Sequence, residues 1–156
     1  MKTIEVKDIL SISGKSGLYK FIAQARNGIV VESFEDNKRH VAPVTARVSS
    51  LDEIAIFTDE EEVPLCDVLY KIYEKEEGKA AISHKSGNDE LKKYFEEILP
   101  GYDDERVYVS DIKKVINWYN ILHHHNMLNP VEKEEEKPEE EKDIQVAETK
   151  KEGDNT

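Results

Sequence analysis

Residues 17–58 constrain the fold more than any other part of this chain, because apolar runs alternate there with turn signals at short, even intervals. In residues 18–26 successive side chains point to opposite faces of an extended strand, and both faces carry apolar residues. The pair Asn27-Gly28 follows, and this pair is preferred in the two-residue type I′ turn, whose twist matches the flanking strands. Residues 29–34 are then the predicted return strand, so the stretch begins as an antiparallel hairpin.

Three further segments extend this hairpin into a sheet. Residues 39–44 are predicted as a third strand, in which Pro43 indicates a sheet edge or a strand end. Ser50 is predicted to cap a single helical turn, since its side chain can accept a hydrogen bond from the backbone N–H two or three residues later. Residues 54–58 are predicted as the closing strand, and the weakly alternating residues 2–12 as a strand or lead-in that covers one end of the barrel.

A meander, one helical turn and a last strand is the element order of SH3-like barrels. Such barrels host many functions, so the comparison concerns the fold alone. We therefore predict an α+β protein with a small N-terminal SH3-like antiparallel β-barrel over residues 1–58.

Residues 59–130 predict a domain of three helices, because apolar side chains recur there at helical spacing in three runs. Pro64 stands where the first residue of a helix is expected, and Gly78 is well placed to end that helix. Asn88 is predicted to cap the second helix and Ser110 the third.

The net charge of −12 is distributed unevenly along the chain. Residues 1–50 carry eight Lys/Arg and five Asp/Glu, residues 51–130 carry nine and eighteen, and residues 131–156 carry five and eleven. The last segment has almost no aliphatic residues, so we predict a disordered acidic tail whose removal changes stability very little. The overall acidity argues against unspecific binding to nucleic acid or anionic lipid, and no DNA or membrane partner is expected.

The single cysteine, Cys66, excludes an intrachain disulfide bond and fits a reducing compartment. The first ten residues have no apolar core long enough for a signal peptide, and no run of 18 apolar residues occurs. We therefore expect a cytoplasmic protein.

Two short motifs suggest chemistry that the surrounding sequence does not support. Gly14-Lys15-Ser16 resembles the end of a phosphate-binding loop, but Ile9 stands where the first glycine is required, and the segment leads into a strand. His123-His124-His125 cannot share one metal ion from an intact helix, because consecutive helical residues point about 100° apart. A sheet loop and a solvated helix end are the favoured interpretations.

Neither Cys66 nor the acidic residues form a recognisable site either. The position of Cys66 near a helix N-terminus can lower a thiol pKa, but the flanking acidic residues oppose this and no histidine is close in sequence. Asp103-Asp104-Glu105 and Asp111 lack the spacing of a calcium loop. We predict no catalytic residue, no metal ligand and no cofactor, and hence a protein that is not an enzyme.

The predicted sheet is the only positively charged part of the chain. Its basic residues, with Tyr19, Phe21 and Phe34 nearby, could form a groove in which RNA bases stack on aromatic rings. Alternatively, the aromatic rings belong to the core and the cations protect strand edges. The candidate partner- or RNA-binding residues are Lys20, Arg26, Lys38, Arg39 and Arg47.

Trp118 is the only tryptophan, and it shares one helical stripe with Val115 and Leu122. This position is typical of a core or interdomain side chain, and an exposed anchor for a partner is the alternative.

Five stretches together resemble a family of small Bacteroidota proteins of unknown function. They are ISGKSGLYKFI at 12–22, NGIVVES at 27–33, DEIAIFTDEEEVPL at 52–65, YEKEEGKAA at 73–81 and RVYVSDIKKVINWYNIL at 106–122. The resemblance covers residues 1–128 and implies a cytoplasmic protein with an N-terminal β unit followed by a helical unit. It implies no activity and no functional residues.

Two functions from different classes remain open on these observations. The first is a non-enzymatic interaction or adaptor protein with a protein partner, because two folding units of opposite charge stand beside no recognisable catalytic motif. The second is an RNA- or ribosome-associated factor that acts through the basic face of the barrel.

Overall fold

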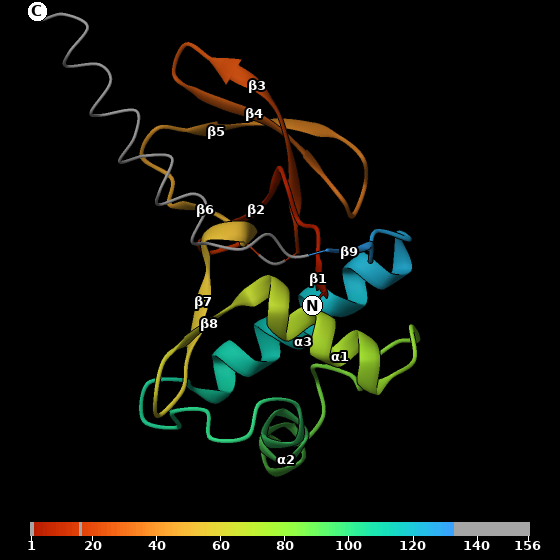
Figure 1. Cartoon of the computed structure of the whole chain (residues 1–156). Coiled ribbons are helices and arrows are strands. Elements are labelled where there is room, and N and C mark those ends of the chain that lie inside the picture. Colours follow the sequence, from red (N-terminus) through yellow and green to blue (C-terminus); the bar gives the residue numbers. More distant parts are fainter. Residues whose placement is uncertain (1, 16, 133–156) are drawn as a thin grey trace, which may run out of the picture.

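The computed structural model describes residues 2–15 and 17–132, and their fold is mixed α+β (Figure 1). The described residues form three α-helices: α1 (Leu65–Lys75), α2 (Asn88–Ile98) and α3 (Val109–His124). The strands of the main sheet are β2 (Ile9–Ile12), β3 (Tyr19–Ala25), β4 (Gly28–Ser33), β5 (Arg39–Pro43) and β6 (Val48–Ser50). The α+β class, the antiparallel sheet and the three helices are thereby confirmed.

The main sheet is antiparallel throughout, in the order β5-β4-β3-β2-β6. The predicted hairpin forms, but its loop consists of Arg26 and Asn27, because Ala25 pairs with Gly28. Gly28 therefore belongs to β4 and not to the turn, which moves the predicted turn back by one residue. The prediction that Pro43 lies at a sheet edge is confirmed, since β5 is an outer strand.

The segment predicted to close the barrel leaves the main sheet instead. After the 3₁₀ turn η1 (Leu51–Glu53), strand β7 (Ala55–Phe57) pairs with β8 (Glu62–Pro64) in a separate two-stranded sheet. The Thr58 hydroxyl accepts hydrogen bonds from two backbone N–H groups of the intervening turn, which folds this hairpin tightly. Among the described residues, β5 and β6 are therefore unpaired edges, and the pairings do not close the sheet into a barrel.

The two ends of the described chain form a third sheet. Strand β1 (Lys2–Ile4) pairs with β9 (Pro130–Glu132), and the Thr3 hydroxyl donates to the buried Asp67 carboxylate on α1 at 2.7 Å. The segment 131–156 was predicted to lack structure from its first residue, and this is wrong for Val131 and Glu132. Residues 133–156 lie outside the described residues.

The helix ends differ from the predicted caps by one to three residues, since Tyr108 is the N-cap of α3 and α1 ends at Lys75, before Gly78. Pro64 and Gly87 precede α1 and α2 as N-caps, so Asn88 is the first residue of α2 and not its cap. Helix α3 begins at Val109, one residue before the predicted cap Ser110. Ser50 is the N-cap of η1 as predicted, but its side chain makes no capping hydrogen bond to the backbone; its hydroxyl donates to the Asp52 carboxylate at 2.6 Å instead.

The main core joins the sheet to the helices. Leu18 and Leu51 from the N-terminal half are buried in one cluster with Leu69, Phe95 and Tyr119 from the three helices. A smaller cluster of Leu10, Ile12, Val31 and Ala42 lies within the curved main sheet. The predicted units 1–58 and 59–130 therefore share a core. No helix among the described residues has the length and apolar character needed to cross a membrane.

Candidate functional site

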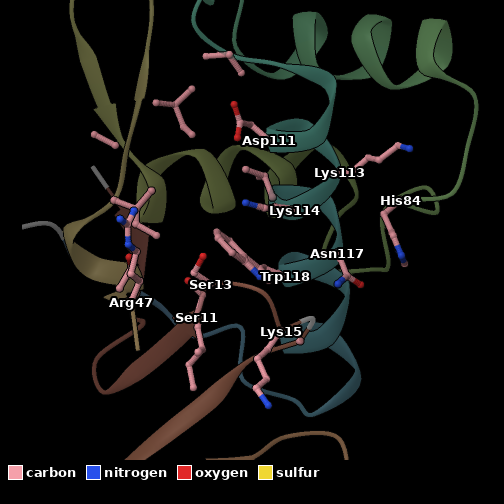
Figure 2. Close-up of a pocket in the computed structure, with 18 of the residues that line it drawn as sticks. Ser11, Ser13, Lys15, Arg47, His84, Asp111, Lys113, Lys114, Asn117 and Trp118 are labelled. Carbon is pink, nitrogen blue, oxygen red and sulfur yellow. The ribbon is translucent and has the colours of Figure 1, made fainter. Parts of the chain in front are cut away.

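A cleft of about 760 Å³ lies between the end of the main sheet and helix α3. One wall is formed by β2, β6 and the loops beside them, another by α3, and β7 closes one end. Figure 2 shows Asp111, Lys114 and Trp118 projecting from one side of α3 toward the strands, with Arg47 opposite them. Two parts of the chain that are far apart in sequence therefore meet here.

Strand register and helix periodicity place the polar side chains of this cleft. Ser11 pairs with Ser49 across β2 and β6, so both side chains point to the same face of the sheet. On α3, Asp111, Lys114 and Trp118 are spaced by three and four residues, which aligns them on one face of the helix. The cleft therefore combines hydroxyl groups from the sheet with a cation and an indole ring from the helix.

Positive charge gathers in the cleft although the whole chain is strongly acidic. Among the described residues that line it, Asp111 is the only acidic one, and the cationic ones are Lys15, Arg47, Arg106, Lys113 and Lys114. The described lining of the cleft thus carries five cations and one carboxylate, whereas the whole chain has a net charge of −12. The local net charge is therefore opposite in sign to that of the chain.

A second, larger cavity of about 1420 Å³ has the opposite character. Seven acidic residues line it, among them Asp59, Glu74 and Glu132, against two lysines. Ala55 on β7 lines both cavities, so a single strand separates the basic cleft from the acidic one.

The charges in the basic cleft differ in how far they are already neutralised. Arg106 donates to the Asp103 carboxylate at 2.8 Å and lies 4.1 Å from the centre of the Phe57 ring. This contact with Arg106 holds the pKa of Asp103 below its usual range. By contrast, no carboxylate among the described residues pairs with Lys15, Arg47 or Lys114. These three cations therefore remain available to an anionic group from outside.

The single carboxylate in the cleft has a structural role at the start of α3. The Asp111 carboxylate accepts a hydrogen bond from the backbone N–H of Tyr108 at 3.0 Å, and its own backbone N–H donates to the Tyr108 carbonyl. Asp111 thereby satisfies a helix-end donor that would otherwise lack a partner. Its charge also lies at the positive end of the helix dipole, so it opposes the cleft cations only in part.

The loop between α1 and α2 forms the outer rim of the cleft through His84. The Asn120 side chain fixes this loop on α3, because it accepts from the N–H of Ala81 at 2.8 Å and donates to the carbonyl of Ile82 at 3.0 Å. The Tyr119 hydroxyl adds a bond to the Lys79 carbonyl at 2.7 Å. Figure 2 shows Lys113 on the side of α3 that faces His84.

Stability is expected to fall between about pH 10 and pH 12, and Tyr119 contributes to this loss. Burial raises the pKa of Tyr119 to about 12, with added contributions from Glu76 and Tyr73. The folded chain thus keeps a proton on Tyr119 that the unfolded chain releases near pH 10. The free energy of unfolding therefore decreases as the pH rises through this window. Urea unfolding at pH 8 and pH 11 measures the loss, which should be smaller for Tyr119→Phe. Equal losses in both proteins would contradict this assignment.

The five basic residues predicted from sequence do not converge on one surface. Lys20 and Arg39 lie on either side of Glu32 in one cross-strand row, and the Arg39 guanidinium contacts the Glu32 carboxylate at 3.6 Å. Arg26 is in the β3–β4 loop, and Lys38 is in the turn at the other end of β4. Arg47 alone lines the basic cleft.

The aromatic residues near these cations belong to the interior. Tyr19 and Phe21 pack against the smaller cluster, while Phe34 is buried in the main core and meets the His125 ring edge-on, with 5.3 Å between centroids. Lys20 lies between Tyr19 and Phe21 in sequence, so it points to the opposite face of β3. The interpretation of the aromatic rings as core residues is therefore confirmed for Phe34, whereas Tyr19 and Phe21 are only partly buried.

The other predicted candidates also find definite places. Trp118 is only 9 % exposed, which fits the predicted core or interdomain position, and its ring also lines the cleft. Lys15, from the segment that resembles a phosphate loop, is a cleft residue. In the described part of the chain no group of three His, Cys, Asp or Glu side chains is arranged to hold a metal ion.

Sequence reasoning missed Arg106, Lys113 and Lys114. The two adjacent lysines lie within residues 51–130, whose net charge is −9. Because charge was summed over this whole segment, their positive charge was not recognised as a candidate site. The helical spacing of Lys114 and Trp118 was the available signal, since it placed a cation beside the single indole.

Two family models match the chain, and they meet close to the cleft. A domain of unknown function, DUF5606, covers residues 6–51, and a second one, DUF6852, covers residues 54–122. Every residue that lines the cleft lies within one of these two ranges, and each range contributes several. The cleft is therefore complete only when both domains are folded together.

A solution NMR structure of a Bacteroides vulgatus protein is similar to this chain, with 48 % sequence identity and a TM-score of 0.68. The match covers 80 % of this chain and 90 % of that one. No curated protein matches. The fold is that of an α+β protein in which a basic cleft lies between the main sheet and helix α3. The chain belongs to the same family of Bacteroidota proteins as the Bacteroides vulgatus protein.

Proposed function

We propose that the protein is a cytoplasmic, non-enzymatic interaction module, an adaptor whose basic cleft holds an acidic segment of a partner protein. The observation that carries this proposal is the inversion of charge: five cations and one carboxylate line a cleft in a chain of net charge −12. An acidic partner gains from this local field, while the remaining surface repels it.

The donors in the cleft suit carboxylate groups. Arg47 presents a guanidinium, which matches a carboxylate in two parallel hydrogen bonds, and Lys15 and Lys114 add charges from two other directions (Figure 2). Ser11 and Ser49 provide hydroxyl donors from the sheet, and the apolar ring of Trp118 offers a surface for the aliphatic part of a glutamate. A protein segment satisfies both the polar and the apolar parts of this lining.

The architecture supports a binding role in a further way. As part of the proposal, we retain the comparison of the N-terminal half with SH3-like folds, on the basis of its curved five-stranded sheet and the adjoining 3₁₀ turn. The edge strand β6 contributes Ser49 to the cleft, and exposed sheet edges are sites where extended peptides add as a further strand.

Charge reversal at the cleft is expected to weaken partner binding about 10-fold or more, because two close attractions become repulsions. The test variant is R47E/K114E, and its matched control is K92E/K93E, which changes the net charge equally on exposed positions of α2. Affinity for a fluorescein-labelled octaglutamate peptide is measured by anisotropy, and partners are captured from native extract with each variant. The control is expected to bind like the wild type.

Three results would contradict the adaptor proposal. Equal affinities of the cleft variant and the control for the peptide would show that the cleft does not bind the acidic segment. Co-purification of a small-molecule substrate would indicate an enzyme. Retention of RNA that is lost on nuclease treatment and in K38E/R39E would favour the RNA- or ribosome-associated alternative, in which the outer row of Lys20 and Arg39 carries the binding.

A further inference from the structure

The chain itself contains a segment with the chemistry that the basic cleft accepts. Residues 133–156 follow the last described residue, Glu132, and carry ten Asp/Glu and five Lys. Six of these acids are glutamates at positions 134–141. No other stretch of eight residues in the sequence holds six acidic residues, and this run belongs to the same chain as the cleft.

The attachment point lines a cavity that shares a wall residue with the cleft. Glu132 lines the acidic cavity, and Ala55 on β7 belongs to the walls of both cavities. The 134–141 run lies two to nine residues beyond Glu132, so it reaches up to about 30 Å when extended, at about 3.3 Å per residue, whereas a folded chain of this size has a radius of gyration of about 14 Å. The 134–141 run can therefore reach the cleft.

The charges of the two cavities direct such a run to one side. The cavity that Glu132 lines carries seven acidic residues and two lysines, and this net negative charge repels an acidic run. Across β7 it meets five cations and one carboxylate, of which Lys15, Arg47 and Lys114 have no carboxylate partner among the described residues. Electrostatic free energy therefore falls as the run moves from the first surface to the second.

We propose that residues 133–156 occupy the basic cleft of their own chain and compete there with the acidic segment of a partner. This inference rests on the proposed function, because the same cations bind both segments. A tethered competitor acts at a local concentration in the millimolar range, so even weak binding in cis reduces the apparent affinity for a partner. A partner therefore binds only if its affinity and concentration are high enough to displace the segment from the cleft.

The test uses the full chain and a fluorescein-labelled octaglutamate peptide as the probe. In the tail variant, glutamine replaces Glu134, Glu135, Glu136, Glu139, Glu140 and Glu141. In the control variant, glutamine replaces six exposed glutamates that lie outside both cavities and the tail: Glu5, Glu35, Glu53, Glu77, Glu90 and Glu96. The tail variant is expected to bind the probe about 3- to 10-fold more tightly than the wild type, and the control to bind like the wild type.

A second readout follows the cleft directly. Trp118 is the only tryptophan and lines the cleft, so its indole N–H signal in an NMR spectrum reports on occupancy. This signal is expected to shift between the wild type and the tail variant, and to lose that difference when R47E/K114E is present in both.

The outcomes separate this inference from the proposed function. Equal probe affinities in the wild type and the tail variant, with an unchanged Trp118 signal, overturn the inference and leave the adaptor proposal standing. An equal gain in the control variant also overturns it, since the effect would then be one of net charge. If the probe binds no variant, the adaptor proposal fails, and a Trp118 shift that R47E/K114E abolishes still supports occupancy by the segment.

Discussion

Replacing Leu51 by alanine is expected to lower the free energy of unfolding by about 2–5 kcal/mol and to unfold the sheet and the helices in one transition. Leu51 is fully buried in the 3₁₀ turn η1, which packs against α1. Truncation leaves a cavity in the core that both halves share, so the loss affects both. Urea unfolding followed by far-UV circular dichroism for the helices, and by amide NMR signals for β3 and β4, measures this.

The matched control is Val44→Ala. Val44 is also an aliphatic residue of the N-terminal half, but it is 75 % exposed, so its truncation should change the free energy of unfolding by less than about 0.5 kcal/mol. If the NMR signals of the sheet outlast the helical signal in Leu51→Ala, residues 1–58 form an independent unit and the shared core is not a cooperative one.

The local elements of the sheet were predictable because their signals lie within a few residues. The β3–β4 hairpin follows from alternation and a turn pair, although the turn moved by one residue to Arg26 and Asn27. The closing strand was misassigned because pairing depends on distant partners. Residues 54–58 are apolar in either arrangement, and only the position of β8 shows that β7 pairs there. Likewise, nothing near Pro130 indicates that β1 is its partner.

The cleft was predictable only in its individual residues. Arg47 was a candidate through the charge of the N-terminal half, and Trp118 through its uniqueness, but their meeting is a tertiary fact. Charge averaged over segments assigned the helical half to the acidic side, whereas one face of α3 carries Lys114 toward the sheet. The net charge of a segment therefore does not identify a site, because a site depends on which charged residues from different segments the fold brings together.

Replacing Gly28 by alanine is expected to destabilise the fold by about 3 kcal/mol, because strands β4 and β5 approach too closely there for a side chain. A Cβ atom at this position would lie 1.9 Å from the Ala42 carbonyl oxygen and 2.9 Å from its carbonyl carbon. Both are backbone atoms of the paired strand, so relief requires β5 to separate from β4. Thermal and urea unfolding, with amide exchange of β4 and β5, measure the effect.

Gly87→Ala is the control, since no atom lies within 4 Å of the position that its Cβ would take. Gly87 is the N-cap of α2 in an extended conformation, so alanine should cost no more than about 1 kcal/mol there. A similar small loss for Gly28→Ala would mean that the edge strand β5 yields easily. In that case faster amide exchange should be confined to β4 and β5, while Trp118 and the cleft keep their wild-type signals. A large loss with global exchange instead identifies the β4–β5 contact as part of the cooperative core that holds the cleft together.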